Sequence, residues 1–288
     1  YVAALQRLSI ENALLKIDDY VHISGGFSFT RQDEFEVTLN DSGPTKRMVN
    51  AYAFGASNVD LFVGSGPYFE DTNEDQVINF EDTRNSDAVG LALENVNLGI
   101  MLMRPTETAH KATKYLALKA SANFAGLVGI DNFELNASDI SVEYNTVKGS
   151  NVTDTTPVVD FKAMNDGGYT FSGIDNASLK LDYSDRILRA SVADAELQID
   201  EYVFIRGKLA FEKGGQQTVK LSNNTTKTVS SINVGAEDLT MFFGTGGPYW
   251  TDVDGDGSIS WSFNTGNGAD ASRTISEGSI LIGATNYT

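Results

Sequence analysis

Apolar and polar residues alternate with a period of two through most of this 288-residue chain. Phe35, Val37 and Leu39 are separated by polar residues. Two further runs with the same alternation are Ile140, Val142 and Tyr144, and Ile259, Trp261 and Phe263. Successive side chains of a β-strand point to opposite faces, so each run would bury one face and expose the other. The pattern predicts an all-β chain.

Only the first 17 residues also permit a helical interpretation. They correspond to a later stretch, LRASVADAELQI, which aligns Ile10 with Val192 and has the alternation of a strand. We therefore expect a strand at this position as well. Clusters typical of turns, such as LNDSGPTK, EKGGQQ and LSNNTTKT, separate the alternating runs.

Long stretches of the chain occur twice. LLKIDDYVHISGGFSF, which begins at Leu14, returns as ELQIDEYVFIRGKLAF, and Ile199 follows its counterpart Ile17 by 182 positions. GASNVDLFVGSGPYFEDTNEDQVIN, which begins at Gly55, returns from Gly235 as GAEDLTMFFGTGGPYWTDVDGDGSIS. The nearly constant offset predicts a repeat unit of about 181 residues. We expect residues 1–181 to form the first unit and residues 182–288 a second, truncated one.

Two arrangements of such units are compatible with the sequence. Each unit could be an independent β-sandwich, or the strands of successive units could stack continuously. No Pro-rich or Ser-rich linker separates the copies, which favours continuity. We expect an elongated rod, either β-solenoid-like or built from stacked β-sandwiches, and we expect the chain to be part of a longer one.

An Ile-Asp pair recurs four times beside alternating runs. The four pairs begin at Ile17, Ile130, Ile174 and Ile199. Asp and Asn in such places hydrogen-bond to nearby backbone and favour turns. Recurrent hairpin corners therefore explain these acids better than catalysis does.

The stretch DVDGDGSIS crowds three aspartates into five positions and resembles the calcium loops of EF-hands and dockerins. By that resemblance the ligands would be Asp252, Asp254, Asp256, Ser258 and Ser260. The twelfth position is Phe263, where the family has a glutamate, so that ligand would come from Asp270 or Glu237 or be missing.

The first copy of the loop, EDTNEDQVIN, keeps the same frame. Its ligands would be Asp71, Asn73, Asp75, Val77 through its carbonyl, Asn79 and, at the twelfth position, Asp82. Gln76 replaces the glycine of the tight turn. Closely spaced carboxylates repel one another unless a cation joins them, so Ca²⁺ explains the pattern better than a plain acidic turn does.

An aromatic step precedes each acidic loop. The steps are Tyr68 and Phe69 in the first copy, and Tyr249 and Trp250 in the second. Exposed rings at these positions could stack on sugars, as in an adhesin or a glycan-binding module. Packing beneath their own loops is the stronger expectation.

Composition excludes several classes of partner. The 39 acidic and 21 basic residues leave a net charge of −18, which disfavours nucleic acid and anionic membrane surfaces. There is no cysteine, so no disulfide or thiolate metal site can form, and no apolar run is long enough for a transmembrane helix. The two histidines, His22 and His110, stand in no recognisable catalytic motif. We expect no enzyme; a calcium-dependent enzyme acting on polysaccharides is the least favoured alternative.

The duplicated β unit, the acidity and the aspartate loops together resemble giant repeat proteins of bacterial surfaces, such as RTX-type adhesin extenders and filament or sheath subunits. This resemblance implies a structural segment of an extracellular or cell-surface protein, stiffened by calcium in its Asp-rich loops. Its partners would be neighbouring repeats of the same or identical chains, with surface polysaccharide as a further partner, and without membrane insertion.

Overall fold

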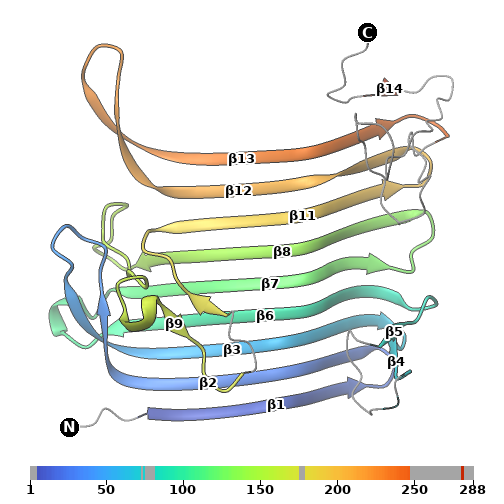
Figure 1. Cartoon of the computed structure of the whole chain (residues 1–288), viewed down its shortest axis with the longest axis horizontal. Helices are drawn as coiled ribbons and strands as arrows, with labels where there is room; N and C mark the ends of the chain where they lie inside the picture. Colours follow the sequence, from blue (N-terminus) through green and yellow to red (C-terminus); the bar gives the residue numbers. More distant parts are fainter. Residues whose placement is uncertain (1–4, 73, 75–81, 175–178, 247–279, 282–288) are drawn as a thin grey trace.

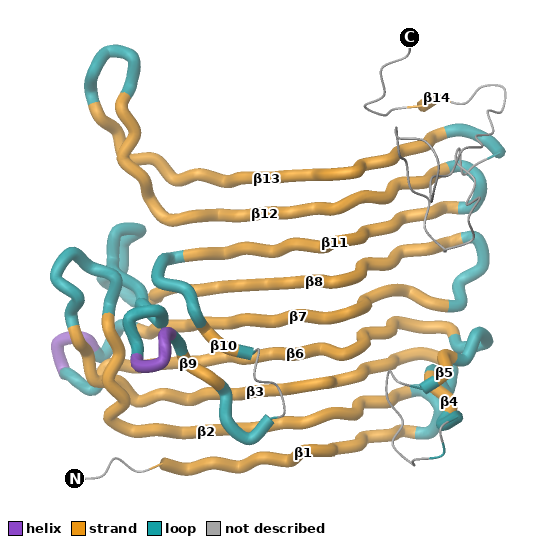
Figure 2. The backbone as a smooth tube through the Cα atoms, in the orientation of Figure 1, coloured by secondary structure: helices purple, strands orange, loops and turns teal. Residues whose placement is uncertain are grey.

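The computed structural model describes residues 5–72, 74, 82–174, 179–246 and 280–281. These residues form one long antiparallel sheet of ten strands, and no α-helix occurs among them (Figures 1 and 2). The all-β prediction is confirmed, including the strand predicted near the N-terminus.

Up to Phe243, two insertions interrupt the succession of neighbouring strands, but the strands of the sheet lie side by side in chain order. They are β1 (Leu5–Ile17), β2 (Val21–Thr38), β3 (Lys46–Ser65), β6 (Val89–Pro105), β7 (Lys114–Val128), β8 (Phe133–Lys148), β11 (Ile187–Ile199), β12 (Val203–Lys220), β13 (Thr226–Phe243) and β14 (Ile280–Leu281). One insertion, residues 66–88, lies between β3 and β6 and is called the arm below. The other, residues 149–186, lies between β8 and β11 and is called the crossover.

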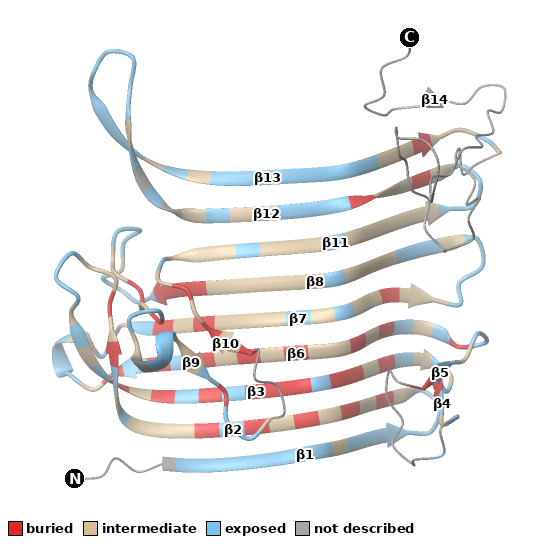
Figure 3. Cartoon of the chain, viewed as in Figure 1, coloured by how far each residue is buried: buried red, intermediate tan, exposed pale blue. Residues whose placement is uncertain are grey.

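The crossover covers one face of the sheet near one end of the strands (Figure 1). It contains η2 (Asn165–Gly167), β9 (Tyr169–Thr170) and β10 (Lys180–Leu181), and the separate short helix η1 (Thr108–His110) joins β6 to β7. Phe161 and Leu181 of the crossover are fully buried against Val49, Met101 and Tyr115 of the sheet. This apolar cluster is the main core of the described chain (Figure 3).

The arm packs at the other end of the strands. It contains β4 (Phe69–Glu70) and β5 (Thr83–Arg84), which pair with each other. Tyr68 and Phe69 are buried beside Phe62 and Ala92 of the sheet. Between the crossover and the arm, the same face of the sheet carries polar side chains.

The two hairpins that carry the repeated sequence have the same pairing. Ile17 pairs with Val21 in β1–β2, and Ile199 pairs with Val203 in β11–β12. In each turn the third residue after the isoleucine donates its N–H to the isoleucine carbonyl at 3.1 Å. Both hairpins also contain a bulge at matching positions, between residues 10 and 13 and between residues 192 and 195.

Three of the four Ile-Asp pairs lie in the turns of antiparallel hairpins, as predicted. Ile17, Ile130 and Ile199 begin the turns of β1–β2, β7–β8 and β11–β12, and Ile174 lies in the loop between β9 and β10. Asp18 and Asp200 have positive φ values in their turns, a conformation that Asp and Asn adopt more readily than most residues. Asp175 lies outside the described residues.

Candidate functional site

The neck of the first acidic loop is held by the short ladder of the arm. Phe69 pairs with Arg84 and Glu70 with Thr83. The Thr72 and Thr83 hydroxyls lie 3.0 Å apart. Asp71 and Asp82 follow directly at the open end of this ladder, and one carboxylate oxygen of each is shielded from solvent. The first and twelfth positions of the predicted loop are thus brought together.

A single buried carboxylate holds both sides of this neck. Glu94 of β6, with a side chain only 4% exposed, accepts two hydrogen bonds from Arg84, from Nε at 2.8 Å and from Nη2 at 2.6 Å. It also accepts a hydrogen bond of 2.5 Å from the Tyr68 hydroxyl. Tyr68 directly precedes β4 and Arg84 belongs to β5, so Glu94 fixes the two strands of the arm to the sheet.

Electrostatics reinforce this clasp of Tyr68, Glu94 and Arg84. Burial, followed by the hydrogen bond to Glu94, raises the pKa of the Tyr68 hydroxyl far above its ordinary value. The hydrogen bond to Glu94 also raises the pKa of Arg84. The Arg84 guanidinium lies 5.3 Å from the centre of the Phe124 ring, a cation–π distance. The donors therefore keep their protons at physiological pH, and the clasp stays intact.

The aromatic step of the first copy packs beneath its own loop. The Tyr68 ring stacks on Phe62 with ring centres 5.1 Å apart, and the Phe69 ring lies 4.6 Å from Tyr68. Tyr68 and Phe69 are both buried. Both rings thus pack beneath their own loop, and neither presents an open ring face to a sugar. Tyr249 and Trp250 lie outside the described residues.

Most of the predicted metal ligands lie outside the described residues. In the first loop these are Asn73, Asp75, Val77 and Asn79, and in the second loop Asp252, Asp254, Asp256, Ser258 and Ser260. Of the candidates for the missing ligand, Asp270 also lies outside, and Glu237 of β13 forms an ion pair of 3.4 Å with Lys208. In the part of the chain that the structure describes, no three acidic or histidine side chains converge on one point. Calcium binding therefore remains a prediction.

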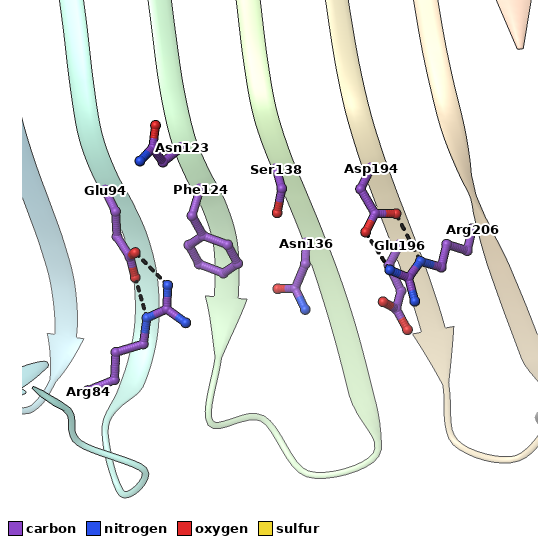
Figure 4. A pocket seen from close by; sticks show the side chains of 9 residues that line it. All are labelled: Arg84, Glu94, Asn123, Phe124, Asn136, Ser138, Asp194, Glu196 and Arg206. Carbon is purple, nitrogen blue, oxygen red and sulfur yellow. Dashed lines mark hydrogen bonds and ion pairs between the residues drawn. The ribbon is translucent and has the colours of Figure 1, made fainter. Parts of the chain in front are cut away.

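A polar pocket of about 380 Å³ lies on the sheet beside the clasp (Figure 4). Two arginine–carboxylate pairs flank it: Arg84 with Glu94 at one side, and Arg206 with Asp194 at the other. Arg206 donates to both Asp194 oxygens, at 2.9 and 2.6 Å. Between the pairs lie side chains from β7, β8 and β11: Asn123, Phe124, Asn136, Ser138 and Glu196.

The floor of the pocket is partly buried. Burial raises the pKa of the Glu196 carboxyl above its ordinary value, although the charge of Arg206 opposes the shift. The Asn136 Oδ1 atom is shielded from solvent and accepts no hydrogen bond from the described residues. Each arginine is already neutralised by its own carboxylate, so the pocket offers hydrogen-bonding groups rather than a strong net charge.

The histidines lie away from this pocket. His22 is buried in β2, where its Nε2 lies 3.1 Å from the Ser24 hydroxyl, and His110 lies in η1 near Arg47. Neither lines the pocket, whose one hydroxyl residue is Ser138. The described residues therefore place no histidine beside that hydroxyl, as a serine nucleophile with a histidine base would require.

Sequence reasoning missed Glu94 and Arg84, the residues that fix the arm. Both stand in stretches of alternating or turn-like sequence without a motif, and only their side-chain contacts identify their role. No protein-family model, curated protein or solved structure matches this chain. Within the described residues, no helix is long and apolar enough to cross a membrane.

Proposed function

We propose that this chain is a structural segment of an elongated repeat protein on the outside of a cell, in which one β-sheet continues from unit to unit. The matching pairings and bulges of β1–β2 and β11–β12 are the observation that carries the proposal. Equal backbone geometry at equal sequence positions supports a repeated structural module rather than chance similarity of sequence.

The pairing of β8 with β11 supports continuity between units. β11 corresponds to β1 in the repeat, and one of its edges pairs along its whole length with β8. The equivalent edge of β1 has no partner strand among the described residues. A β8-like strand from a preceding unit would complete it, and an exposed edge of this length would otherwise invite non-specific pairing.

Each repeat would then lengthen the sheet by a fixed amount. One unit contributes six strands, β1, β2, β3, β6, β7 and β8. At the usual strand spacing of about 4.8 Å, six strands add about 29 Å per unit. The strands run across the rod, and the crossover and the arm recur along one side of it.

Calcium would stabilise the loops of this rod. The pairing of Glu70 with Thr83 supports this proposal, because Asp71 and Asp82 are the next residues and would be the first and last ligands of the calcium loop. The second loop has the more complete aspartate frame, DVDGDG. Calcium is millimolar outside cells, so even weak sites of the extracellular type would be filled there.

The length increment tests the repeat scaffold. Chains with two, three and four copies of residues 1–181 would be compared by small-angle X-ray scattering. The proposal expects the maximum dimension to grow by about 29 Å per copy and the copies to unfold in one cooperative transition. Independent beads joined by flexible links, with one transition per bead, would refute it.

Titration calorimetry with Ca²⁺ alone tests the loops. We expect two sites in the 288-residue chain, one lost in Asp71→Asn/Asp82→Asn and the other in Asp252→Asn/Asp256→Asn. Asp87→Asn, which changes an exposed aspartate of the arm outside the loop frame, is the matched control and should retain both sites. Absence of any calcium-dependent heat would remove calcium from the proposal and leave the repeat scaffold standing.

A further inference from the structure

In the part of the chain that the structure describes, no segment covers the face of the sheet opposite the crossover, and this face carries a large apolar area. Cross-strand pairing aligns its side chains into four rows that run across the strands. Row 1 consists of Leu8, Phe29, Phe54, Ile100, Leu118, Tyr144 and Leu188. Row 2 consists of Ile10, Phe27, Ala56, Leu98, Ala120, Val142, Ala190, Phe211 and Val234.

The other two rows lie nearer the end of the strands that holds the arm. Row 3 consists of Leu15, Ile23, Leu61, Leu93, Ala125, Ala137, Ala195 and Gly207. Row 4 consists of Ile17, Val21, Val63, Leu91, Leu127, Leu135, Leu197, Ile205 and Met241. No charged residue occurs in rows 2 to 4, and row 1 ends at Leu188 because its next partner, on β12, is Lys213.

Neighbouring residues show that this face is open. Ala53 is 4% exposed beneath the crossover, whereas the next residue, Phe54, is 37% exposed. Met101 and Leu102 of β6 differ in the same way, at 1% and 49%. Both insertions of the described chain pack on the opposite face, and none of its segments packs on this one (Figures 1 and 3).

The area of this face exceeds what a soluble monomer ordinarily exposes. Row 2 crosses nine strands, and rows 1 to 4 span residues 54 to 63 along β3. With strands about 4.8 Å apart and a rise of about 3.3 Å per residue, the face measures about 38 by 30 Å, or roughly 1,100 Å². The largest apolar patch of a typical monomer is about 300–600 Å². A stable protein interface needs about 800 Å² per partner.

We propose that a second copy of this chain covers the face, so that two sheets pack face to face around a two-fold axis parallel to the strands. Such an axis reverses the strand order of one sheet over the other. An apolar sheet face matches another of the same extent, and packed sheets lie about 10 Å apart with interdigitated side chains.

The distribution of side-chain size favours this symmetry. In row 3, the strands from β1 to β6 carry large residues and the strands from β7 to β12 carry small ones. An axis between β6 and β7 therefore places the large residues of one copy over the small residues of the other. Row 2 alternates large and small residues from Phe27 to Phe211, which leaves a hollow beside each large side chain. The face is thus complementary to itself.

Sedimentation equilibrium of the 288-residue chain tests the dimer. Two adjacent leucines of β1 provide a matched pair: Leu15, in row 3, is 50% exposed, and Leu14, on the opposite face, is 60% exposed. We expect a dimer whose dissociation constant rises about 100-fold in Leu15→Glu and in Leu91→Glu, because each buries an unpaired carboxylate. Leu14→Glu should stay within about twofold of the parent chain, because its carboxylate remains in water.

Chemical crosslinking tests the symmetry independently, because the chain has no cysteine of its own. A short bismaleimide should join two copies of Ala125→Cys, which lies beside the axis, but not two copies of Ser121→Cys, on the opposite face of the same strand. A folded parent chain that stays monomeric at micromolar concentration would overturn the proposal, and so would a monomer that instead binds phosphatidylcholine vesicles through this face. The proposal does not depend on the repeat scaffold, whose test is the length increment.

Discussion

Replacement of Glu94 by glutamine tests whether one buried carboxylate holds the arm on the sheet. Glu94→Gln preserves the shape of the side chain but removes its charge, and it turns an amide N–H₂ group toward the donors of Arg84. Three hydrogen bonds of 2.5 to 2.8 Å depend on the carboxylate. The variant therefore replaces a satisfied ion pair with a contact between donors.

The expected loss of stability follows from burial. Removal of one partner of a buried ion pair costs about 3–5 kcal/mol. The Glu94 side chain is 4% exposed, but that of Arg84 is 58% exposed, so water can recover part of the arginine's hydration. We therefore expect a loss of about 2–3 kcal/mol, which corresponds to a fall of about 5 °C in Tm for a chain of this size.

Thermal unfolding followed by far-UV circular dichroism measures the loss, and hydrogen exchange locates it. The Asn85 N–H donates to the Tyr68 carbonyl at 2.7 Å within the arm, so it should exchange faster in Glu94→Gln. Amides of β11 and β12 should not change. EDTA in every sample removes any contribution from bound metal.

Asp194→Asn is the matched control for this experiment. Asp194 binds Arg206 with the same two-bond geometry, but its side chain is 37% exposed. Arg206 is only 15% exposed, but it stays beside the charge of Glu196 after the replacement, so Asp194→Asn should cost less than Glu94→Gln, about 1 kcal/mol. Equal losses in the two variants, or unchanged exchange at Asn85, would refute the role assigned to Glu94.

Three further predictions concern packing and pH. Gly55 and Gly235 are repeat equivalents, but a Cβ on Gly55 would meet Ile174 at 3.0 Å and one on Gly235 would meet nothing within 4 Å. Urea unfolding should therefore show a loss of stability of about 1–3 kcal/mol in Gly55→Ala and a gain of about 0.5 kcal/mol in Gly235→Ala. Equal effects of the two substitutions would contradict this packing. Burial raises the pKa of Tyr183 far above the ordinary 10.0, so the unfolded chain releases this proton first and stability should fall as pH rises above about 10. Urea midpoints should fall less steeply in Tyr183→Phe, and an unchanged slope would exclude Tyr183 as the cause. Burial also raises the pKa of Glu196, so stability should likewise fall as pH rises above the ordinary 4.5. Glu196→Gln should therefore be more stable than the parent chain by up to about 1 kcal/mol at pH 7 and equal to it at low pH. A variant less stable than the parent at pH 7 would contradict the raised pKa.

Much of the fold was predictable because it depends on local pattern. Alternation with a period of two predicted the strands, and the repeated Ile-Asp pairs predicted turns, since both properties depend on a few adjacent residues. The alternation changes phase inside some strands, where Asn58, Asn95 and Asp139 have positive φ values. A single left-handed residue shifts which side chains face the crossover, and sequence periodicity does not reveal the shift.

The candidate site was predictable only in part. The acidic frame identified Asp71 and Asp82, which the structure brings to the neck of one loop. Nothing in the sequence around Glu94 distinguishes it from the many other acidic residues. Its role arises because the arm folds back onto β6 and places Tyr68 and Arg84 over it, and this contact involves residues distant along the chain.

The sequence by itself determined the β character of the chain and the acidity of its loops, because these follow from residue type and spacing. The tertiary structure alone decided which face of the sheet is covered. Both faces carry apolar side chains in alternation, and local pattern cannot tell them apart. The crossover and the arm lie on the same face, so the polar pocket forms between them, and four apolar rows remain open on the other face. Since apolar surface gains free energy by leaving water, that asymmetry underlies the proposed pairing of two sheets.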